Sequence, residues 1–177
     1  MSRRRVVTGH DQHGRSVFVV DETVEPVTLS LLPGAAFHQV WGRDGPASVP
    51  DDAACLDRYR YFPPVGGFRF GFFTLAPDTV TVGSDVDLGA ALDELEARLP
   101  GMAEVMEPDH PGMHTTDTVD FDVVMSGEVW LELDDGHEVR LGPGDCVVQN
   151  GTRHAWHNRT REPCTVAVAI VGAGRRS

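Results

Sequence analysis

Short apolar segments separated by turn residues dominate the first half of the chain. They are rich in β-branched and aromatic side chains, as strands are, and occupy residues 16–20, 27–32, 36–41 and 68–75. Residues 42–57 form a long polar stretch that contains Pro46 and Pro50. This stretch predicts a surface loop or lid.

One segment has helical periodicity. Apolar residues recur every three or four positions between Leu88 and Leu99, with charged side chains on the other face. Asp87 is a suitable N-cap, and Pro100 with Gly101 ends the segment. The pattern predicts one short amphipathic helix whose leucine stripe packs into the core.

The second half is more regular. Its predicted strands are residues 121–125, 128–133, 137–141, 146–149, 153–158 and 164–171. Asp134-Asp135-Gly136 is a strong hairpin signal, and Asn150-Gly151 marks another turn. Short strands with turns every 8–12 residues predict an all-β sandwich or barrel. We expect one structural domain, in which the strands, loop and helix of residues 1–105 pack on a barrel core of residues 106–177.

Composition excludes several functions. The chain has 177 residues, of which 41% are hydrophobic and 24% charged, and its formal net charge is −12. This acidic balance argues against nucleic acid as a partner, because phosphate binding requires a basic surface. The chain contains no lysine, which excludes Schiff-base chemistry and a P-loop.

Cysteine usage and the apolar runs indicate a cytoplasmic protein. Cys55, Cys146 and Cys164 are scattered and form no C-x-x-C motif, so a thiolate zinc site has no support. The late apolar run at residues 166–171 is too short to span a membrane. Arg3-Arg4-Arg5 resembles the start of a signal peptide, but Thr8-Gly9-His10-Asp11 stands where such a peptide has its apolar stretch.

Three side chains suggest a metal site. His114 and Asp120 flank a turn-like stretch, and His154 follows the Asn150-Gly151 turn. Two imidazoles and a carboxylate suit a divalent ion such as iron, manganese, nickel or zinc, and leave open positions for substrate or water. The alternative is a pair of ordinary hydrogen-bonded histidines.

Two motifs around these residues resemble those of the cupin superfamily. The stretch from Pro111 through His114 and Asp120 to Gly127 is similar to the first cupin motif, with aspartate in place of the usual glutamate. In the second motif, P-x-G-x-x-H-x-x-x-N, the residues Gly151, His154 and Asn158 match in register. The resemblance covers about residues 106–171, and implies a conserved jelly-roll β-barrel with a metal at its mouth.

The chain departs from the family pattern at the ligands. The usual H-x-H pair is reduced to His114, and Gln149 stands where the second motif has proline. The resemblance therefore implies either a three-ligand metal site or a metal-free pocket.

Other polar residues are candidates for the same pocket. Asp122 shares a strand face with Asp120, so two carboxyl groups inside one barrel would raise one pKa and make Asp122 a general acid or base. The alternative is that Asp122 faces solvent. His38 is a second candidate for proton transfer if the N-terminal strands cover the barrel mouth. Asp117 is either a further ligand or a turn residue.

Two residues could line a substrate pocket. Gln149 offers an amide, although a structural hydrogen bond explains it equally well. Trp156 shares a strand face with His154 and would form an aromatic wall, or else a core tryptophan.

These features favour a small enzyme that uses a divalent metal to act on a small oxygenated metabolite, as a dehydratase, isomerase, decarboxylase or dioxygenase. The alternatives are a non-catalytic small-molecule-binding protein, with or without metal, and a structural role. Because exposed strand edges must be paired or covered, we also expect a homodimer.

Overall fold

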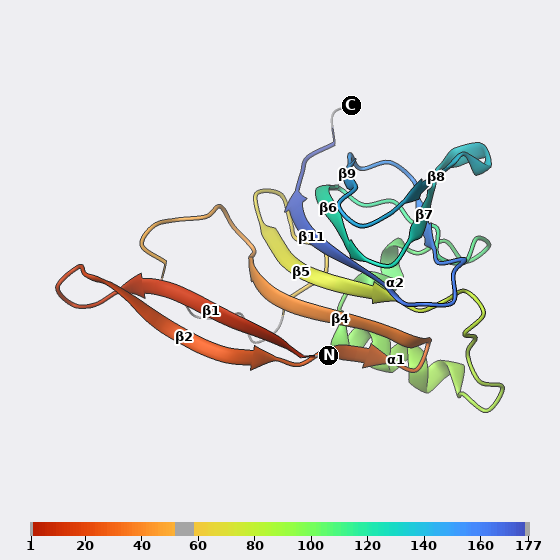
Figure 1. Ribbon diagram of the computed structural model, residues 1–177, viewed down its shortest axis with the longest axis horizontal. Coiled ribbons are helices and arrows are strands. Elements are labelled where there is room, and N and C mark those ends of the chain that lie inside the picture. Colours follow the sequence, from red (N-terminus) through yellow and green to blue (C-terminus); the bar gives the residue numbers. More distant parts are fainter. Residues whose placement is uncertain (1, 52–58, 176–177) are drawn as a thin grey trace.

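The computed structural model describes residues 2–51 and 59–175 of the chain. Within these ranges the protein is built almost entirely from strands, with two short helices between the fifth and sixth strands (Figure 1). None of the described helices is long and apolar enough to cross a membrane. The prediction of an all-β fold with N-terminal strands and a short helix is confirmed.

The elements before residue 106 form the N-terminal half. Its strands are β1 (Arg3–His10), β2 (Ser16–Val24), β3 (Val27–Leu29), β4 (Leu32–Arg43) and β5 (Phe68–Leu75). They are followed by α1 (Leu88–Arg98) and α2 (Met102–Val105). Asp87 caps α1 as predicted, since its carboxylate accepts hydrogen bonds from the amides of Gly89 and Ala90.

The second half contains the remaining strands. They are β6 (Thr118–Ser126), β7 (Val129–Glu132), β8 (Glu138–Leu141), β9 (Cys146–Gln149), β10 (Ala155–His157) and β11 (Cys164–Gly172). Gly127, which the first motif contains, turns the chain after β6 with a φ of 75°. A Cβ at this position would lie 2.5 Å from the carbonyl oxygen of Pro163, so only glycine fits.

The strands form three sheets. The largest has the order β3-β4-β5-β11-β6-β9, the second the order β10-β7-β8, and β1 and β2 form a separate two-stranded hairpin. The first two sheets enclose a hydrophobic core in which Val129 and Val166 are completely buried. Leu95 of α1 and Leu99, which directly follows this helix, join this core. The hairpin extends away from the rest of the molecule (Figure 1).

The sequence-based boundaries fail at three places. β1 was not expected, because the charges of residues 3–5 obscure its alternation. The predicted strand 27–32 is divided, since Leu29 pairs with Leu32 across a tight turn. Part of the predicted loop 42–57 belongs to β4, which continues to Arg43. Residues 52–57 of that loop, with Cys55, lie outside the described residues.

Candidate functional site

His114 and His154 are direct neighbours although they lie forty residues apart in the chain. Their backbones form an isolated antiparallel bridge, with both N–H···O distances at 2.9 Å. This pairing places the two side chains on one face, and their ring centroids are 4.1 Å apart. Both residues are buried. The structure thus brings together the two histidines that the sequence singled out.

Each imidazole is oriented by a backbone carbonyl. The Nδ1 of His114 lies 3.0 Å from the oxygen of Gly112, and the Nδ1 of His154 lies 3.0 Å from the oxygen of Thr152. A carbonyl oxygen can only accept, so we assign the ring proton of His114 to Nδ1 and its lone pair to Nε2, as in metal-binding histidines. The Nδ1 of His154 faces both the carbonyl of Thr152, an acceptor, and the side-chain amide nitrogen of Gln149, a donor 2.8 Å away.

Burial keeps both rings neutral at pH 7. It lowers the pKa of His154 to about 4, with a further contribution from the neighbouring His114. The pKa of His114 is also lowered, mainly by burial. Neutral imidazoles are suitable metal ligands, because a protonated ring has no free lone pair.

Two buried carboxyl groups lie on the inner face of β6. Asp120 pairs in register with Gln149 of β9 on one side and with Ile170 of β11 on the other. Asp122 occupies the next inward position, opposite Val168. The structure therefore places both aspartates inside the barrel, as their alternation indicated.

The two carboxyl groups have raised pKa values. Burial raises the pKa of Asp120 to about 6, against the opposing hydrogen bond from Thr118. Burial, together with the charge of Asp120, raises the pKa of Asp122 to about 8. At neutral pH Asp122 therefore carries a proton while Asp120 is largely ionised, which is the condition for one to act as an acid beside the other.

Tyr61 is a site residue that the sequence did not reveal. Burial and the charges of Asp120 and Asp122 raise the pKa of its phenol, so the hydroxyl stays protonated. Its ring packs edge-on against Phe37 and Phe62, and Phe62 lies 6.2 Å from the ring of His114. No local motif precedes Tyr61, so only the fold could identify it.

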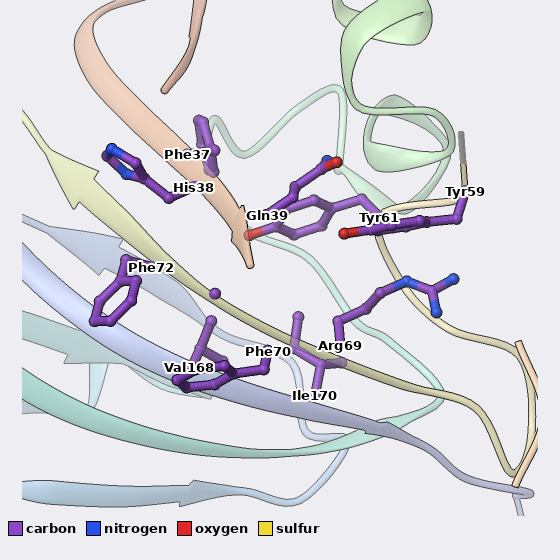
Figure 2. A pocket seen from close by; sticks show the side chains of 11 residues that line it. Phe37, His38, Gln39, Tyr59, Tyr61, Arg69, Phe70, Phe72, Val168 and Ile170 are labelled. Carbon is purple, nitrogen blue, oxygen red and sulfur yellow. The ribbon is translucent and has the colours of Figure 1, made fainter. Parts of the chain in front are cut away.

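A small cavity lies beside Tyr61. It has a volume of about 20 Å³, room for about one water molecule. Figure 2 shows the side chains of Gln39 and Tyr61 on one side of this cavity and those of Val168 and Ile170 on the other, with Arg69 beside Ile170.

The two predicted pocket residues contact the histidines. Gln149 is buried, and its amide lies 2.8 Å from the Nδ1 of His154. Trp156 packs edge-on toward the ring of His154 at 6.2 Å, and also against Phe73 at 5.8 Å. Both residues therefore contact His154, Gln149 through a polar contact and Trp156 through packing.

Two other candidates lie elsewhere. His38 pairs in register with Phe72, whereas the neighbouring Phe37 pairs with the core residue Phe73. Residues that pair directly share a face of the sheet, so His38 lies on the outer face, and in Figure 2 its ring points away from Tyr61. Asp117 is exposed and forms an ion pair with Arg175. Neither side chain therefore joins Asp120 and Asp122 on the inner face, although His38 is itself buried.

The side chains of His114, Asp120 and His154 are chemically suitable ligands for a divalent ion. The two imidazoles supply nitrogen ligands, and the Oδ1 atom of Asp120 is buried without a hydrogen-bond partner. An unpartnered buried carboxylate oxygen is costly unless a cation compensates it. His114, Asp120 and His154 do not, however, form a cluster with all ligand atoms within 4.8 Å of one another. At least one of the three side chains would have to move for all of them to share an ion.

Among the described residues, one group of three side chains has all its ligand atoms within 4.8 Å of one another. It consists of Glu132, Glu138 and His157 on the outer face of the three-stranded sheet. His157 Nε2 lies 2.6 Å from Glu132, and Glu138 is held in an ion pair by Arg159. Because Arg159 already neutralises Glu138, this group is explained as a surface network of ion pairs.

Comparison with known proteins agrees with the two motifs. Residues 102–171 match the family model described as Cupin domain. Oryzines biosynthesis cluster protein J of Aspergillus oryzae (strain ATCC 42149 / RIB 40) is 38% identical over 115 residues, which cover 60% of this chain and 64% of that protein. Phomopsin biosynthesis cluster protein D of Diaporthe leptostromiformis is 48% identical over 48 residues, which cover 27% of this chain and 25% of that protein.

The chain thus matches less than two thirds of the length of these curated relatives. Among solved structures, the cupin domain of Schizosaccharomyces pombe Cnp3 aligns with a TM-score of 0.47 and 8% identity, covering 96% of this chain and 87% of that chain. The match of the family model falls on the strands that carry both motifs and the paired histidines. The comparisons therefore support the resemblance of this chain to the cupin superfamily, with the match at residues 102–171.

Proposed function

We propose that this protein is a small-molecule enzyme whose reaction centre is the polar interior of the barrel, with a divalent ion held by His114, His154 and Asp120. When bound, such an ion would polarise a carbonyl or carboxylate oxygen of the substrate, or activate water. The observation that carries the proposal is the bridged pair of neutral imidazoles, each with its Nδ1 beside a backbone carbonyl.

The other groups divide the remaining tasks. Asp122 is the candidate for proton transfer, because its raised pKa of about 8 lets it hold a proton at neutral pH and release it to an adjacent base. Gln149 holds the ring of His154 in position. Tyr61 and Phe62 cover the interior and exclude water from it. The location of His38 on the outer face removes the support for its proposed role in proton transfer.

The substrate proposed is a small oxygenated metabolite. The names of the three matched relatives place them in the biosynthesis clusters of oryzines and phomopsin, which supports a role in small-molecule biosynthesis for this chain as well. Dehydration, isomerisation, decarboxylation and dioxygenation remain the candidate reactions. A cytoplasmic location and a homodimer stay predictions.

Metal binding is the direct test. The purified protein is stripped with a chelator and titrated with Mn²⁺, Fe²⁺, Ni²⁺ and Zn²⁺ by calorimetry, with mass-spectrometric metal analysis of the loaded protein. We expect one site per chain. His114→Ala and His154→Ala should each weaken binding more than about 100-fold, since even supporting residues cost 10–100-fold. Gln149→Ala should cost about tenfold.

His157→Ala is the matched control, because it removes a histidine from the outer ion-pair network and leaves the interior intact. It should bind metal as the unmodified protein does. If His157→Ala loses the ion while His114→Ala and His154→Ala keep it, the metal site lies on the outer face and the proposal is wrong.

A metal-free binding protein is the second candidate function. It is favoured by the absence of a cluster of His114, Asp120 and His154 with all ligand atoms within 4.8 Å of one another, and by the reduction of the H-x-H pair to His114. Under this alternative the stripped protein keeps its ligand affinity, and His154→Ala changes that affinity little.

A further inference from the structure

One row of paired residues crosses the inner face of the six-stranded sheet at the small cavity. It runs from Gln39 on β4 through Gly71 on β5 and Val168 on β11 to Asp122 on β6. Residues that pair directly share a face of the sheet. Gln39 and Asp122 therefore belong to the same wall of the barrel interior, although they lie far apart in the chain.

The middle of this row contains no large side chain. A Cβ on Gly71 would lie 2.4 Å from the carbonyl oxygen of His38, so only glycine fits at this position. Gly71 and Val168 both line the cavity beside Tyr61, which has room for about one water molecule. The row therefore leaves a recess in the interior that can take one oxygen-bearing group of a ligand.

Two uncharged hydrogen-bond donors belong to the residues around this recess. The amide nitrogen of Gln39 is buried and has no hydrogen-bond partner among the described residues. Burial, together with the charges of Asp120 and Asp122, raises the pKa of Tyr61, so its hydroxyl keeps a proton that it can donate. A buried donor without a partner costs stability. A ligand oxygen that accepts these hydrogen bonds would remove that cost.

The guanidinium of Arg69, which also lines the cavity, is engaged by the protein itself. Its Nε donates to the carbonyl of Arg60 at 2.9 Å, and its Nη1 donates to the carbonyls of Arg43 and Phe68 at 2.8 and 2.9 Å. Its Nη2 donates to the carboxylate of Asp44, which balances the charge. Arg69 therefore cannot offer the forked pair of donors with which arginine binds a carboxylate or a phosphate.

An anionic group would be poorly accommodated in this recess. Asp120 and Asp122 already bring two buried carboxyl groups to the same interior, and a further negative charge beside them is disfavoured. An anion that leaves water without gaining a cationic partner also loses its hydration. An uncharged oxygen avoids both costs and can still accept a hydrogen bond from Gln39.

We propose that Gln39 and Tyr61 are specificity-determining residues, which donate hydrogen bonds to an uncharged hydroxyl or carbonyl oxygen of the substrate in preference to a carboxylate or a phosphate. This inference rests on the proposed function, because it takes the barrel interior as the place where the substrate binds. Such a site discriminates between ligands, since a ligand without the matching oxygen leaves the buried donors unpaired.

Two probes of nearly equal size test this assignment. Glycolamide carries a hydroxyl and an uncharged carbonyl, whereas glycolate has a carboxylate in place of the amide. Each is titrated into isotope-labelled protein stripped with a chelator, up to about 0.1 M because so small a molecule binds weakly. The side-chain amide resonance of Gln39, assigned by its loss in Gln39→Leu, is followed by NMR. Glycolamide should shift this resonance and bind more than about tenfold more tightly than glycolate.

Removing either donor should weaken the binding of glycolamide and leave that of glycolate unchanged. Gln39→Leu and Tyr61→Phe should each weaken glycolamide about 3- to 10-fold, the effect of one neutral hydrogen bond. The backbone amide resonances of β4 and β5 report binding in both variants. Tyr61→Phe keeps the ring that packs against Phe37 and Phe62, and circular dichroism checks that each variant is folded.

Gln12→Leu is the matched control. Gln12 is exposed in the turn between β1 and β2, so this variant should bind glycolamide as the unmodified protein does. The use of stripped protein separates this inference from the proposed metal site, because the preference between the probes does not depend on an ion. Gln39→Leu should also bind Mn²⁺ with unchanged affinity. A chain that binds no metal but prefers glycolamide would refute the proposed function and support the assignment of Gln39 and Tyr61.

Three results would overturn the assignment. The first is glycolate binding as tightly as glycolamide. The second is a side-chain amide resonance of Gln39 that glycolamide does not shift, which would mean that the cavity only holds water. The third is glycolamide binding that neither Gln39→Leu nor Tyr61→Phe weakens.

Discussion

The two faces of β6 have opposite character, and both are unusual. The inner face carries Thr118, Asp120 and Asp122, which are buried and polar. The outer face carries Phe121 and Met125, which are exposed and apolar. In an ordinary sheet that is solvated on one side, the polar side chains face water and the apolar ones face the core.

This inversion is costly on both sides of the strand. Buried carboxyl groups cost stability unless they are paired or neutralised. Exposed aromatic side chains leave apolar surface in contact with water. The same alternation along one strand therefore places carboxyl groups inside the barrel and apolar groups on its surface.

The largest difference between the two faces of the six-stranded sheet is expected when a charged residue is introduced on each face in turn. Val166 on β11 is completely buried in the core, whereas Val148 on β9 is exposed. Val166→Asp should destabilise the fold by about 4–5 kcal/mol or prevent folding, because it buries an unpaired charge. Val148→Asp should change the unfolding free energy by less than about 1 kcal/mol. Urea denaturation of dilute protein measures both, and equal losses would contradict the assignment of the faces.

Removing an aromatic ring from the inner face should have the next largest effect. Phe73 is buried and packs against Trp156 with 5.8 Å between ring centres. Phe73→Ala should lower the unfolding free energy by about 3–4 kcal/mol through lost burial and a cavity. Phe70→Ala on the outer face is the matched control, and should cost much less in the monomer. Thermal and urea unfolding would show the difference, and a comparable loss in both would refute it.

Replacing the carboxyl group of Asp122 by an amide should stabilise the protein at neutral and higher pH. The pKa of Asp122 is raised from 3.8 to about 8 in the fold, so the folded state resists ionisation and stability falls as pH rises from about 4 to about 8. Asp122→Asn removes this cost. Its advantage should be absent near pH 4 and reach on the order of 5 kcal/mol at pH 8.

Denaturant titrations at several pH values measure this advantage. Asp93→Asn, on the exposed side of α1, is the control and should not gain stability with pH. An advantage of Asp122→Asn that is the same at pH 4 and pH 8 would show that the carboxyl group of Asp122 is not held protonated.

The smallest effect is expected at the surface beside His154. Glu107 accepts hydrogen bonds from Arg153 at 2.6 and 2.7 Å, and this contact holds the pKa of Glu107 below its usual range. A lowered pKa contributes stability that is present at neutral pH and is lost as pH falls through it. Glu107→Gln should therefore be slightly less stable than the unmodified protein at pH 7 and equally stable in acid. Unfolding curves at both pH values test this, and a difference that persists in acid would contradict it.

Local signals predicted the parts of the fold that depend on neighbours in the chain. The cap at Asp87 and the leucine stripe predicted α1, and Asp134-Asp135-Gly136 predicted the connection between β7 and β8. The motif residues His114 and His154 were found because their spacing resembles a family pattern. Tyr61 could not be found in this way, since its relation to Asp120 and Asp122 exists only after folding.

The sequence by itself determined the strand-rich character of the chain, the position of its helix and the period-two alternation of Asp120 and Asp122 with apolar residues. These features depend on backbone preferences and on residues a few positions apart. Only the tertiary structure decided which face of each strand lies inside, because that depends on register with strands distant in the chain. The pairing of His38 with Phe72, rather than with a core residue, turned its ring outward, and the bridge between His114 and His154 brought two remote imidazoles into contact.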